Sequence, residues 1–174
     1  MNSLRQNFMV RSTYKIIKAM ADEIQRKLIS DMPEEVQQAF NTGGYWHDNP
    51  HWEYMIKDQE RIIQRFQELL IILKNPIFIE DLFLDRKIVT IGKEIEIKNI
   101  AVNESETFKI LGSADIIYNP KCPPKKGFIS NQSPLARSLL GKSCGDEILI
   151  QLPRQKNKRI VILKIEPIDF EKLQ

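Results

Sequence analysis

Two stretches in the first half of the chain repeat mainly apolar residues at alternating intervals of three and four positions. The first series is Tyr14, Ile17, Ala21, Ile24 and Leu28, and the second is Met55, Gln59, Ile62, Phe66, Leu69 and Leu73. This spacing places one narrow apolar seam on each of two helices, as in a two-stranded coiled coil. Residues 42–44, Thr-Gly-Gly, separate the two series, and Pro50 suits the first turn of the second helix. We therefore predict an antiparallel helical hairpin, whose second helix runs from Pro50 to Leu73 and is roughly 35 Å long at about 1.5 Å per residue.

Pro33 interrupts the first helical pattern. A proline inside a helix removes one backbone hydrogen bond and either ends the helix or kinks it. Two alternatives are open from the sequence: a new segment starts there with Asp31 as its cap, or one continuous helix is kinked.

From Ile77 onward the pattern changes from helical to alternating, which is typical of strands. The predicted strands are Ile88–Ile91, Glu94–Ile97, Thr107–Ile110, Gly127–Ser130, Glu147–Ile150 and Arg159–Ile165. One short helix is expected at Ser133–Leu140, with Ser133 as its cap, Pro134 at its first position and Gly141 as its terminator. The sequence therefore predicts an α+β chain: a coiled-coil hairpin over residues 1–76 with its tip near 42–53, a connector at 77–85, and a small antiparallel β domain over 86–174.

Composition restricts the class of protein further. A net charge of +3 over 174 residues does not require a nucleic-acid partner, and the basic run from Arg154 to Arg159 fits a solvated turn. Cys122 and Cys144 have neither metal-ligand nor redox spacing. The longest unbroken apolar run is Leu69–Leu73, too short for a membrane span. We expect a soluble, cytoplasmic protein with reduced cysteines and no membrane partner.

Residues 133–142, Ser-Pro-Leu-Ala-Arg-Ser-Leu-Leu-Gly-Lys, are followed by Gly145 and Asp146. This stretch closely resembles the C-terminal signature of the GreA/GreB transcript cleavage factors: a serine-proline, a short amphipathic helix, and a glycine-aspartate turn that leads into a strand. Residues 89–92 and 110–112 extend the similarity upstream, and residues 33–36 resemble the proline-containing stretch before the family's hairpin tip. The segments occur in the family's order.

The resemblance implies a fold and a function. The C-terminal domain would be FKBP-like and would dock on the rim of the secondary channel of bacterial RNA polymerase, with Ser133 and Pro134 at docking positions and Gln132 beside them. The coiled coil would reach down the channel, where tip acids help to hold a second Mg²⁺ and the polymerase cleaves its backtracked transcript. The factor would donate carboxylates without being an enzyme itself, contact the RNA 3′ end only indirectly, and act as a monomer.

The tip departs from the family pattern, which reads Gly-Asp-Leu-Ser-Glu-Asn-Ala-Glu-Tyr. Residues 44–54 here are Gly-Tyr-Trp-His-Asp-Asn-Pro-His-Trp-Glu-Tyr, with two extra residues after Asn49. Tyr45 then takes the place of the first acid and Asp48 that of the second. The resemblance implies Asp48 as the metal-positioning acid and Glu53 as a more distant one. The alternatives are that Asp48 caps the second helix and that Glu53 belongs to the hairpin surface.

The tip also holds both histidines and both tryptophans of the chain. Tyr45, Trp46 and Trp52 either pack together to close the hairpin end or stack on an extruded base. His47 and His51, four residues apart, would bind a transition metal if both were helical, or would assist proton transfer.

Three other functions compete with transcript cleavage. A factor with this tip would enter the channel and modulate or inhibit transcription without cleavage. A peptidyl-prolyl isomerase would need an aromatic pocket floored by tryptophan, but residues 86–174 contain no tryptophan. A scaffold whose coiled coil binds an unrelated partner is the third.

Overall fold

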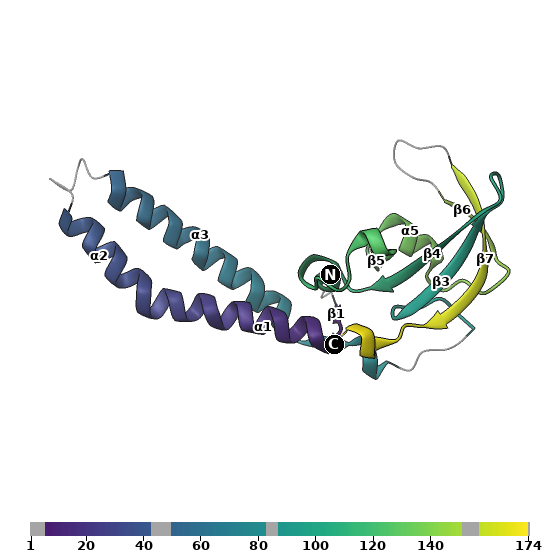
Figure 1. The fold of residues 1–174 in the computed structure, drawn as a ribbon, viewed down its shortest axis with the longest axis horizontal. Coiled ribbons are helices and arrows are strands. Elements are labelled where there is room, and N and C mark those ends of the chain that lie inside the picture. Colours follow the sequence, from purple (N-terminus) through teal and green to yellow (C-terminus); the bar gives the residue numbers. More distant parts are fainter. Residues whose placement is uncertain (1–5, 43–49, 83–86, 151–156, 174) are drawn as a thin grey trace, which may run out of the picture. The chain divides into compact units, whose positions relative to one another are not determined.

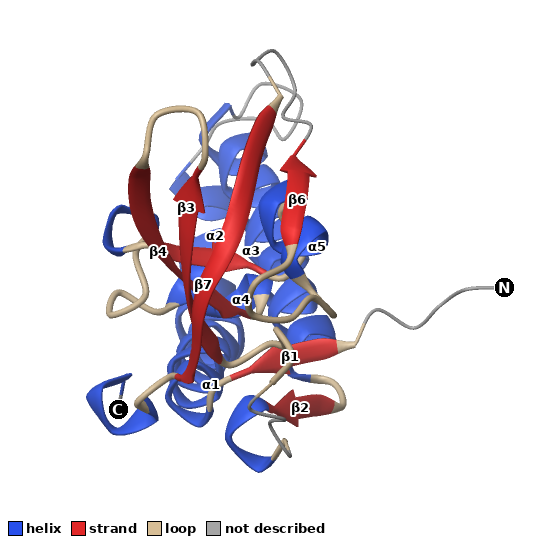
Figure 2. Ribbon diagram, turned by 90° about the vertical axis from the view of Figure 1, so that its right-hand side faces the viewer, coloured by secondary structure: helices blue, strands red, loops and turns tan. Residues whose placement is uncertain are grey.

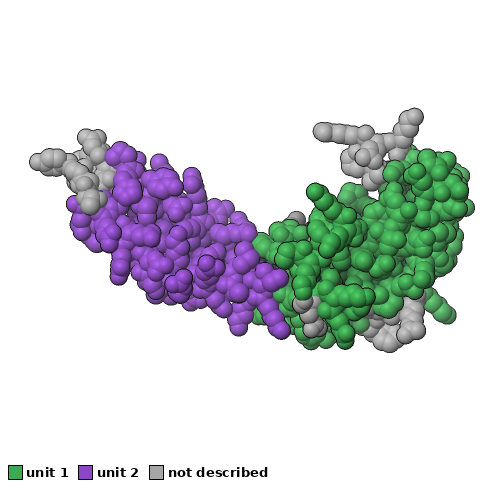
Figure 3. All heavy atoms as spheres, in the orientation of Figure 1, with its two compact units in different colours: residues 1–14, 75–174 green, residues 15–74 purple. Residues whose placement is uncertain are grey.

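The computed structural model describes residues 6–42, 50–82, 87–150 and 157–173. The chain divides into two compact units (Figure 3), which we call the hairpin unit, residues 15–74, and the sheet unit, residues 1–14 and 75–174. The sequence placed residues 1–76 together in the hairpin. The contacts instead group residues 1–14 with the sheet unit, because a short strand near the N-terminus pairs with a strand at residues 76–78.

Helix α1 spans Arg11–Arg26, α2 spans Met32–Thr42 and α3 spans Pro50–Leu73. Figure 1 shows α2 and α3 side by side in the hairpin unit. The bounds of α3 are those that the seam and Pro50 predict. None of the seam residues is exposed: Leu69 is fully buried, and the other five are half-buried. The helical hairpin is therefore confirmed.

A π-helical turn, Lys27–Asp31, joins α1 to α2. The N–H of Met32 bonds to the carbonyl oxygen of Lys27, five residues earlier, instead of four. The chain thus passes Pro33 without leaving helical conformation, since Pro33 falls in the first turn of α2, where its missing N–H is tolerated. Of the two alternatives, the continuous helix is observed, and Asp31 lies inside the turn instead of at a cap.

The π turn also changes which residues face the partner helix. Continued beyond Leu28, the three-four series would fall on polar residues, namely Asp31, Glu35 and Gln38. The buried and half-buried apolar residues lie one position later: Met32, Val36 and Ala39. A π turn takes up one extra residue, so the apolar face of α2 is kept in line with that of α1.

The sheet unit contains a five-stranded sheet in the order β5-β4-β3-β7-β6. Its strands are β3, Lys93–Asn99; β4, Glu104–Leu111; β5, Phe128–Ser130; β6, Glu147–Ile150; and β7, Lys158–Pro167. Figure 2 labels four of these strands, β4, β3, β7 and β6, side by side. Three neighbouring pairs are antiparallel, as predicted, but β4 and β5 are parallel. The helix α4, Ser113–Tyr118, lies between β4 and β5 in sequence, and a crossover of this kind is what a parallel pair requires.

Two further predictions were wrong. Residues 88–91 are not a strand. The N–H of Val89 donates to Lys142, its carbonyl oxygen accepts from Gly141, and a single bridge joins Ile88 to Ser143. The short helix near the C-terminus is also not the only one, because α4 is a second. The sequence further missed a parallel pair made by β1, Asn7–Met9, and β2, Pro76–Phe78.

The predicted helix at residue 133 is α5, Pro134–Leu139, and it covers the inner face of the sheet. Its Ala136 and Leu139 are fully buried against inward-facing isoleucines, which are Ile95, Ile97, Ile110, Ile148, Ile150, Ile160 and Ile162. A second cluster, which includes Val10, Leu111 and Phe128, holds the N-terminal segment against the rest of the sheet unit. Both cysteines are free thiols, Cys122 buried and Cys144 exposed. None of the helices in the described ranges is long and apolar enough to cross a membrane.

Candidate functional site

The hairpin tip lies between Thr42, the last residue of α2, and Pro50, the first residue of α3. Four of the predicted site residues fall in this interval and lie outside the described residues: Tyr45, Trp46, His47 and Asp48. The assignment of Asp48 as a metal-positioning acid therefore stays a prediction.

Glu53 is exposed in the first turn of α3. A carboxylate in this position interacts favourably with the positive end of the helix dipole. Glu53 therefore has an ordinary role at the helix start, and its carboxylate is accessible to a ligand from outside the chain. His51 is also exposed on the first turn of α3.

Trp52 contacts Phe40 of α2, with ring centroids 6.2 Å apart and ring planes at 66°. This edge-to-face geometry is a favourable arrangement for two aromatic rings. Trp52 is half-buried and joins the two helices of the hairpin close to its end, which supports the interpretation that this tryptophan packs within the hairpin. Tyr54 is instead 58% exposed.

Within the described ranges, no group of three or more His, Cys, Asp or Glu side chains is placed to hold a metal ion. The acids that the resemblance implies, Asp48 and Glu53, supply hard oxygen ligands, which Mg²⁺ prefers. Two carboxylates from this chain leave most of an octahedral shell open. Their chemistry fits an ion whose other ligands come from elsewhere.

The predicted docking residues lie at the start of α5. Ser133 is the cap of this helix, and its Oγ accepts a hydrogen bond of 3.2 Å from the N–H of Ala136. Pro134 is the first helical residue and is exposed, as is Gln132, whose N–H donates to Ser130 Oγ at 3.1 Å. The capping role predicted for Ser133 is confirmed.

The glycine-aspartate turn follows α5. Asp146 Oδ2 accepts a hydrogen bond of 2.8 Å from the N–H of Ser143, and the N–H of Gly145 donates to Ile162 of β7. Gly145 has φ +89°, a left-handed conformation that glycine adopts without strain. The turn leads into β6, as the sequence motif indicates.

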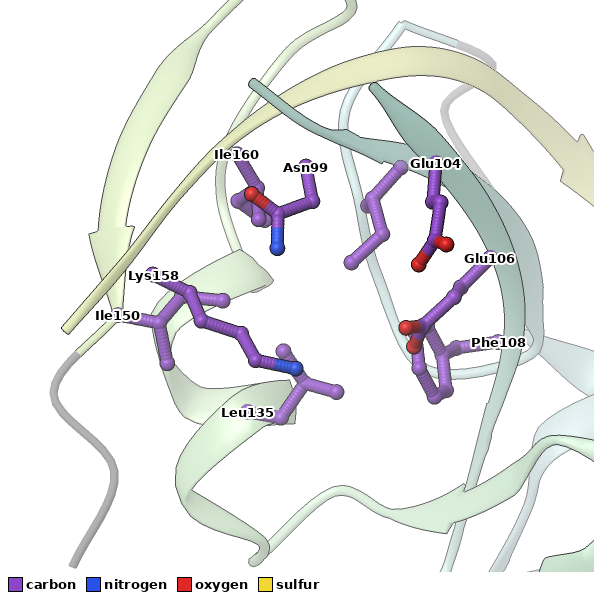
Figure 4. A pocket seen from close by; sticks show the side chains of 9 residues that line it. Asn99, Glu104, Glu106, Phe108, Leu135, Ile150, Lys158 and Ile160 are labelled. Atoms are coloured by element: carbon purple, nitrogen blue, oxygen red, sulfur yellow. The ribbon is translucent and has the colours of Figure 1, made fainter. Parts of the chain in front are cut away.

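A pocket on the inner face of the sheet, beside α5, was not predicted (Figure 4). We call it the inner-face pocket. Its cavity volume is about 50 Å³. Apolar side chains form its floor: Ile97, Phe108, Leu135, Ile150 and Ile160. Polar side chains form its rim: Asn99, Glu104, Glu106 and Lys158. The alternation of residues along β4 indicates this pocket, because Glu104 and Glu106 lie on the same face of the strand as the buried Ile110.

A buried carboxyl, Asp115, lies where the N-terminal segment meets α4. Its two oxygens accept hydrogen bonds of 3.0 Å from the backbone N–H groups of Val10 and Gly112. Burial raises the pKa of Asp115 from its usual 3.8 to about 6, against the effect of these bonds and of one from Thr13, and the nearby Glu80 raises it further. Fully buried Asp115 therefore holds the start of α1 through charge-assisted hydrogen bonds.

Residues 84–167 match the protein family described as "Transcription elongation factor, GreA/GreB, C-term". Three bacterial relatives named transcription elongation factor GreA are similar to the chain. The one from Macrococcus caseolyticus is 32% identical over 118 residues, 68% of this chain and 70% of that relative. The one from Bacillus cytotoxicus is 36% identical over 98 residues, 56% of this chain, and the chain spans 58% of that relative. The one from Staphylococcus epidermidis is 26% identical over 166 residues, 95% of this chain and 100% of that relative.

Among solved structures, the GreA factor homolog 1 (Gfh1) protein of Thermus thermophilus is similar over 93% of this chain and 99% of its own, with 17% identity and a TM-score of 0.40. The family match, the signature at residues 133–146 and the relative from Macrococcus agree with one another. The chain belongs to the GreA/GreB family of transcription elongation factors.

Proposed function

We propose that this protein binds bacterial RNA polymerase, inserts its hairpin into the secondary channel and stimulates Mg²⁺-dependent cleavage of backtracked RNA. Membership of the GreA/GreB family is the observation that carries the proposal. The helical hairpin supports it, because α3 has 24 residues and is roughly 36 Å long at about 1.5 Å per residue.

The two units have different tasks in this proposal. The sheet unit, with an FKBP-like fold, docks on the rim of the channel through Gln132, Ser133 and Pro134. The cap at Ser133 fixes the first turn of α5, and this leaves Pro134 and Gln132 exposed for contact. The hairpin carries the tip acids to the polymerase active site.

At the tip, Asp48 would hold a Mg²⁺ ion together with the polymerase, and Glu53, which is exposed, would offer a second carboxylate. Bound Mg²⁺ supplies activation of the attacking water and stabilisation of the leaving oxygen. Asp48 and Glu53 would orient and hold this ion, and the polymerase would provide its remaining ligands. The protein is therefore an accessory factor, and the hydrolysis is the polymerase's own.

A second candidate function follows from Tyr45, which stands where the family pattern has its first acid. A tyrosine hydroxyl is a poor Mg²⁺ ligand, so the tip has lost one of two carboxylates. A protein of this kind would occupy the channel and modulate transcription without cleavage.

The two functions are separated by adding the purified full-length protein to backtracked elongation complexes with Mg²⁺. The wild type is expected to accelerate RNA cleavage, and Asp48→Ala to lower the rate at least about tenfold, since a metal-positioning carboxylate is removed. Glu60→Ala, on an exposed part of α3 away from the tip, is the matched control and should cleave like the wild type.

Polymerase binding is measured alongside for every variant. Full cleavage by Asp48→Ala would overturn the assignment of that residue. Binding without cleavage by the wild type would favour the modulator.

A further inference from the structure

The inner-face pocket follows from the register of the strands. Ile97 of β3 lies opposite Glu106 of β4, and Asn99 lies opposite Glu104. The inward-facing residue near the end of β4, Ile110, is apolar and buried, whereas the inward-facing residues toward its start are acidic. The inner face therefore changes from a closed core to an open, charged rim at this end of the sheet.

Glu104 and Glu106 are exposed, and Lys158 of β7 is half-buried on the other side of the pocket. Figure 4 shows the two carboxylates and the Lys158 ammonium directed toward the open space between them. Within the described ranges, none of these three side chains forms an ion pair. The rim carries two negative charges and one positive charge, and its β4 side is purely acidic.

The pocket also adjoins the proposed docking residues. Leu135, which forms part of its floor, follows directly after Ser133 and Pro134 in α5. Its cavity volume of about 50 Å³ is well below the range for ligand sites, about 300–1,000 Å³. The space has room for one side chain of a protein partner and is too small for a cofactor.

We infer that the inner-face pocket receives an apolar side chain of the polymerase that is flanked by a basic residue. The apolar group contacts the floor at Phe108, Leu135 and Ile160, and the basic group meets Glu104 and Glu106. Acidic rim charges of this kind raise the association rate and select against partners with acidic groups at that position. The inference rests on the proposed function and names the contact that would give docking its specificity.

The test measures binding of the full-length protein to the core RNA polymerase of the organism that encodes it, at low and at high salt. Glu104→Gln combined with Glu106→Gln keeps side-chain size and removes both charges. Glu96→Gln combined with Glu147→Gln is the matched control, because both residues lie on the opposite face of the sheet. Circular dichroism melting of each variant checks that it is folded.

The pocket pair is expected to weaken binding at least about tenfold at low salt, with a smaller effect at high salt, because salt screens exposed charges. The control pair should stay within about twofold of the wild type. Reversal of both charges, Glu104→Lys with Glu106→Lys, should weaken binding further.

Three results would overturn the inference. Unchanged or tighter binding by the pocket pair would exclude the acidic contact and leave the proposed function in place. An equal loss in the control pair would assign the effect to overall charge. Absence of polymerase binding by the folded wild type would remove the proposed function together with the inference.

Discussion

At the scale of single residues, a buried polar cluster fixes the first turn of α1 to the rest of the sheet unit. Asp115 accepts from the backbone of Val10, and Asn119 donates to the hydroxyls of Ser12 and Thr13 at 3.2 and 3.1 Å. Asp115, Asn119 and Thr13 are all buried, so their hydrogen bonds do not compete with water. Loss of one partner would leave a buried polar group unsatisfied, at a cost of about 1–3 kcal/mol.

Asp115 makes stability depend on pH. Its pKa is raised from 3.8 to about 6, so between these values the folded protein binds more protons than the unfolded chain. The contribution of this group is complete below pH 3.8 and is lost as the pH rises through about 6, a change of about 3 kcal/mol in the free energy of unfolding. Asp115→Asn lacks this titrating group. From pH 4 to pH 7, we therefore expect the unfolding free energy of the variant to rise relative to that of the wild type by about this amount.

Urea denaturation of both proteins at several pH values, followed by circular dichroism, measures that difference. Because all other titrating groups are common to the two proteins, their contributions cancel. A difference that stays constant with pH would show that Asp115 titrates normally.

At the scale of elements, strand β1 depends on a close approach to the N-terminal end of α4. A Cβ added to Gly112 would lie 1.7 Å from the carbonyl oxygen of Phe8. Gly112 has φ −69°, which any residue adopts, so the restriction is purely steric. The absence of a side chain at this position is what allows β1 to lie against α4.

Gly112→Ala is therefore expected to displace β1 and to lower the free energy of unfolding by about 1–3 kcal/mol, through overpacking. Hydrogen exchange should show loss of protection in Asn7–Met9 while β7 keeps its own. Gly141→Ala is the control: it has φ +79° but nothing within 4 Å of an added Cβ, so it would strain only its own backbone. Equal protection of β1 in both variants would contradict the steric explanation.

The sequence predicted those elements whose own residues carry a periodic signal. The bounds of α3 follow from its seam and Pro50, and the start of α5 follows from Ser133 and Pro134. The segment 88–91 alternates like a strand, but among the described residues its backbone partner is the short turn at residues 141–143, so no ladder forms there. Strands β1 and β2 have three residues each, too few to show a period.

The candidate site was predictable to a similar extent. The cap at Ser133 is local in sequence and was found, whereas the bond between Val10 and Asp115 joins residues 105 positions apart. The inner-face pocket likewise depends on the register of β3 against β4, which no single segment specifies. The role of Asp48 remains a prediction.

At the scale of the whole molecule, the two units differ in the size of their cores. The described residues of the hairpin unit that are fully buried are Ile17, Ala21, Met32, Ala39 and Leu69. The sheet unit holds two hydrophobic clusters with more than three times as many buried residues. Local opening is easier where few apolar contacts must break.

We accordingly expect backbone amides in α2 and α3 to exchange with deuterium at least about tenfold faster than those in β3 and β7. Exchange followed by mass spectrometry on the intact full-length protein, with proteolysis after quenching, resolves the two units. Equal rates would mean that the hairpin unfolds only together with the sheet unit.

The π turn at Lys27–Asp31 has a consequence for how such a chain changes over generations. A single codon inserted into a helical arm normally rotates everything beyond it by about 100° and exposes its buried side, but here the surplus residue is absorbed locally. Loss of one residue from the turn would convert it to ordinary α-helix and still present Met32, Val36 and Ala39 to the neighbouring helix. The first arm of this hairpin could therefore lose one residue without a second mutation to restore its apolar face.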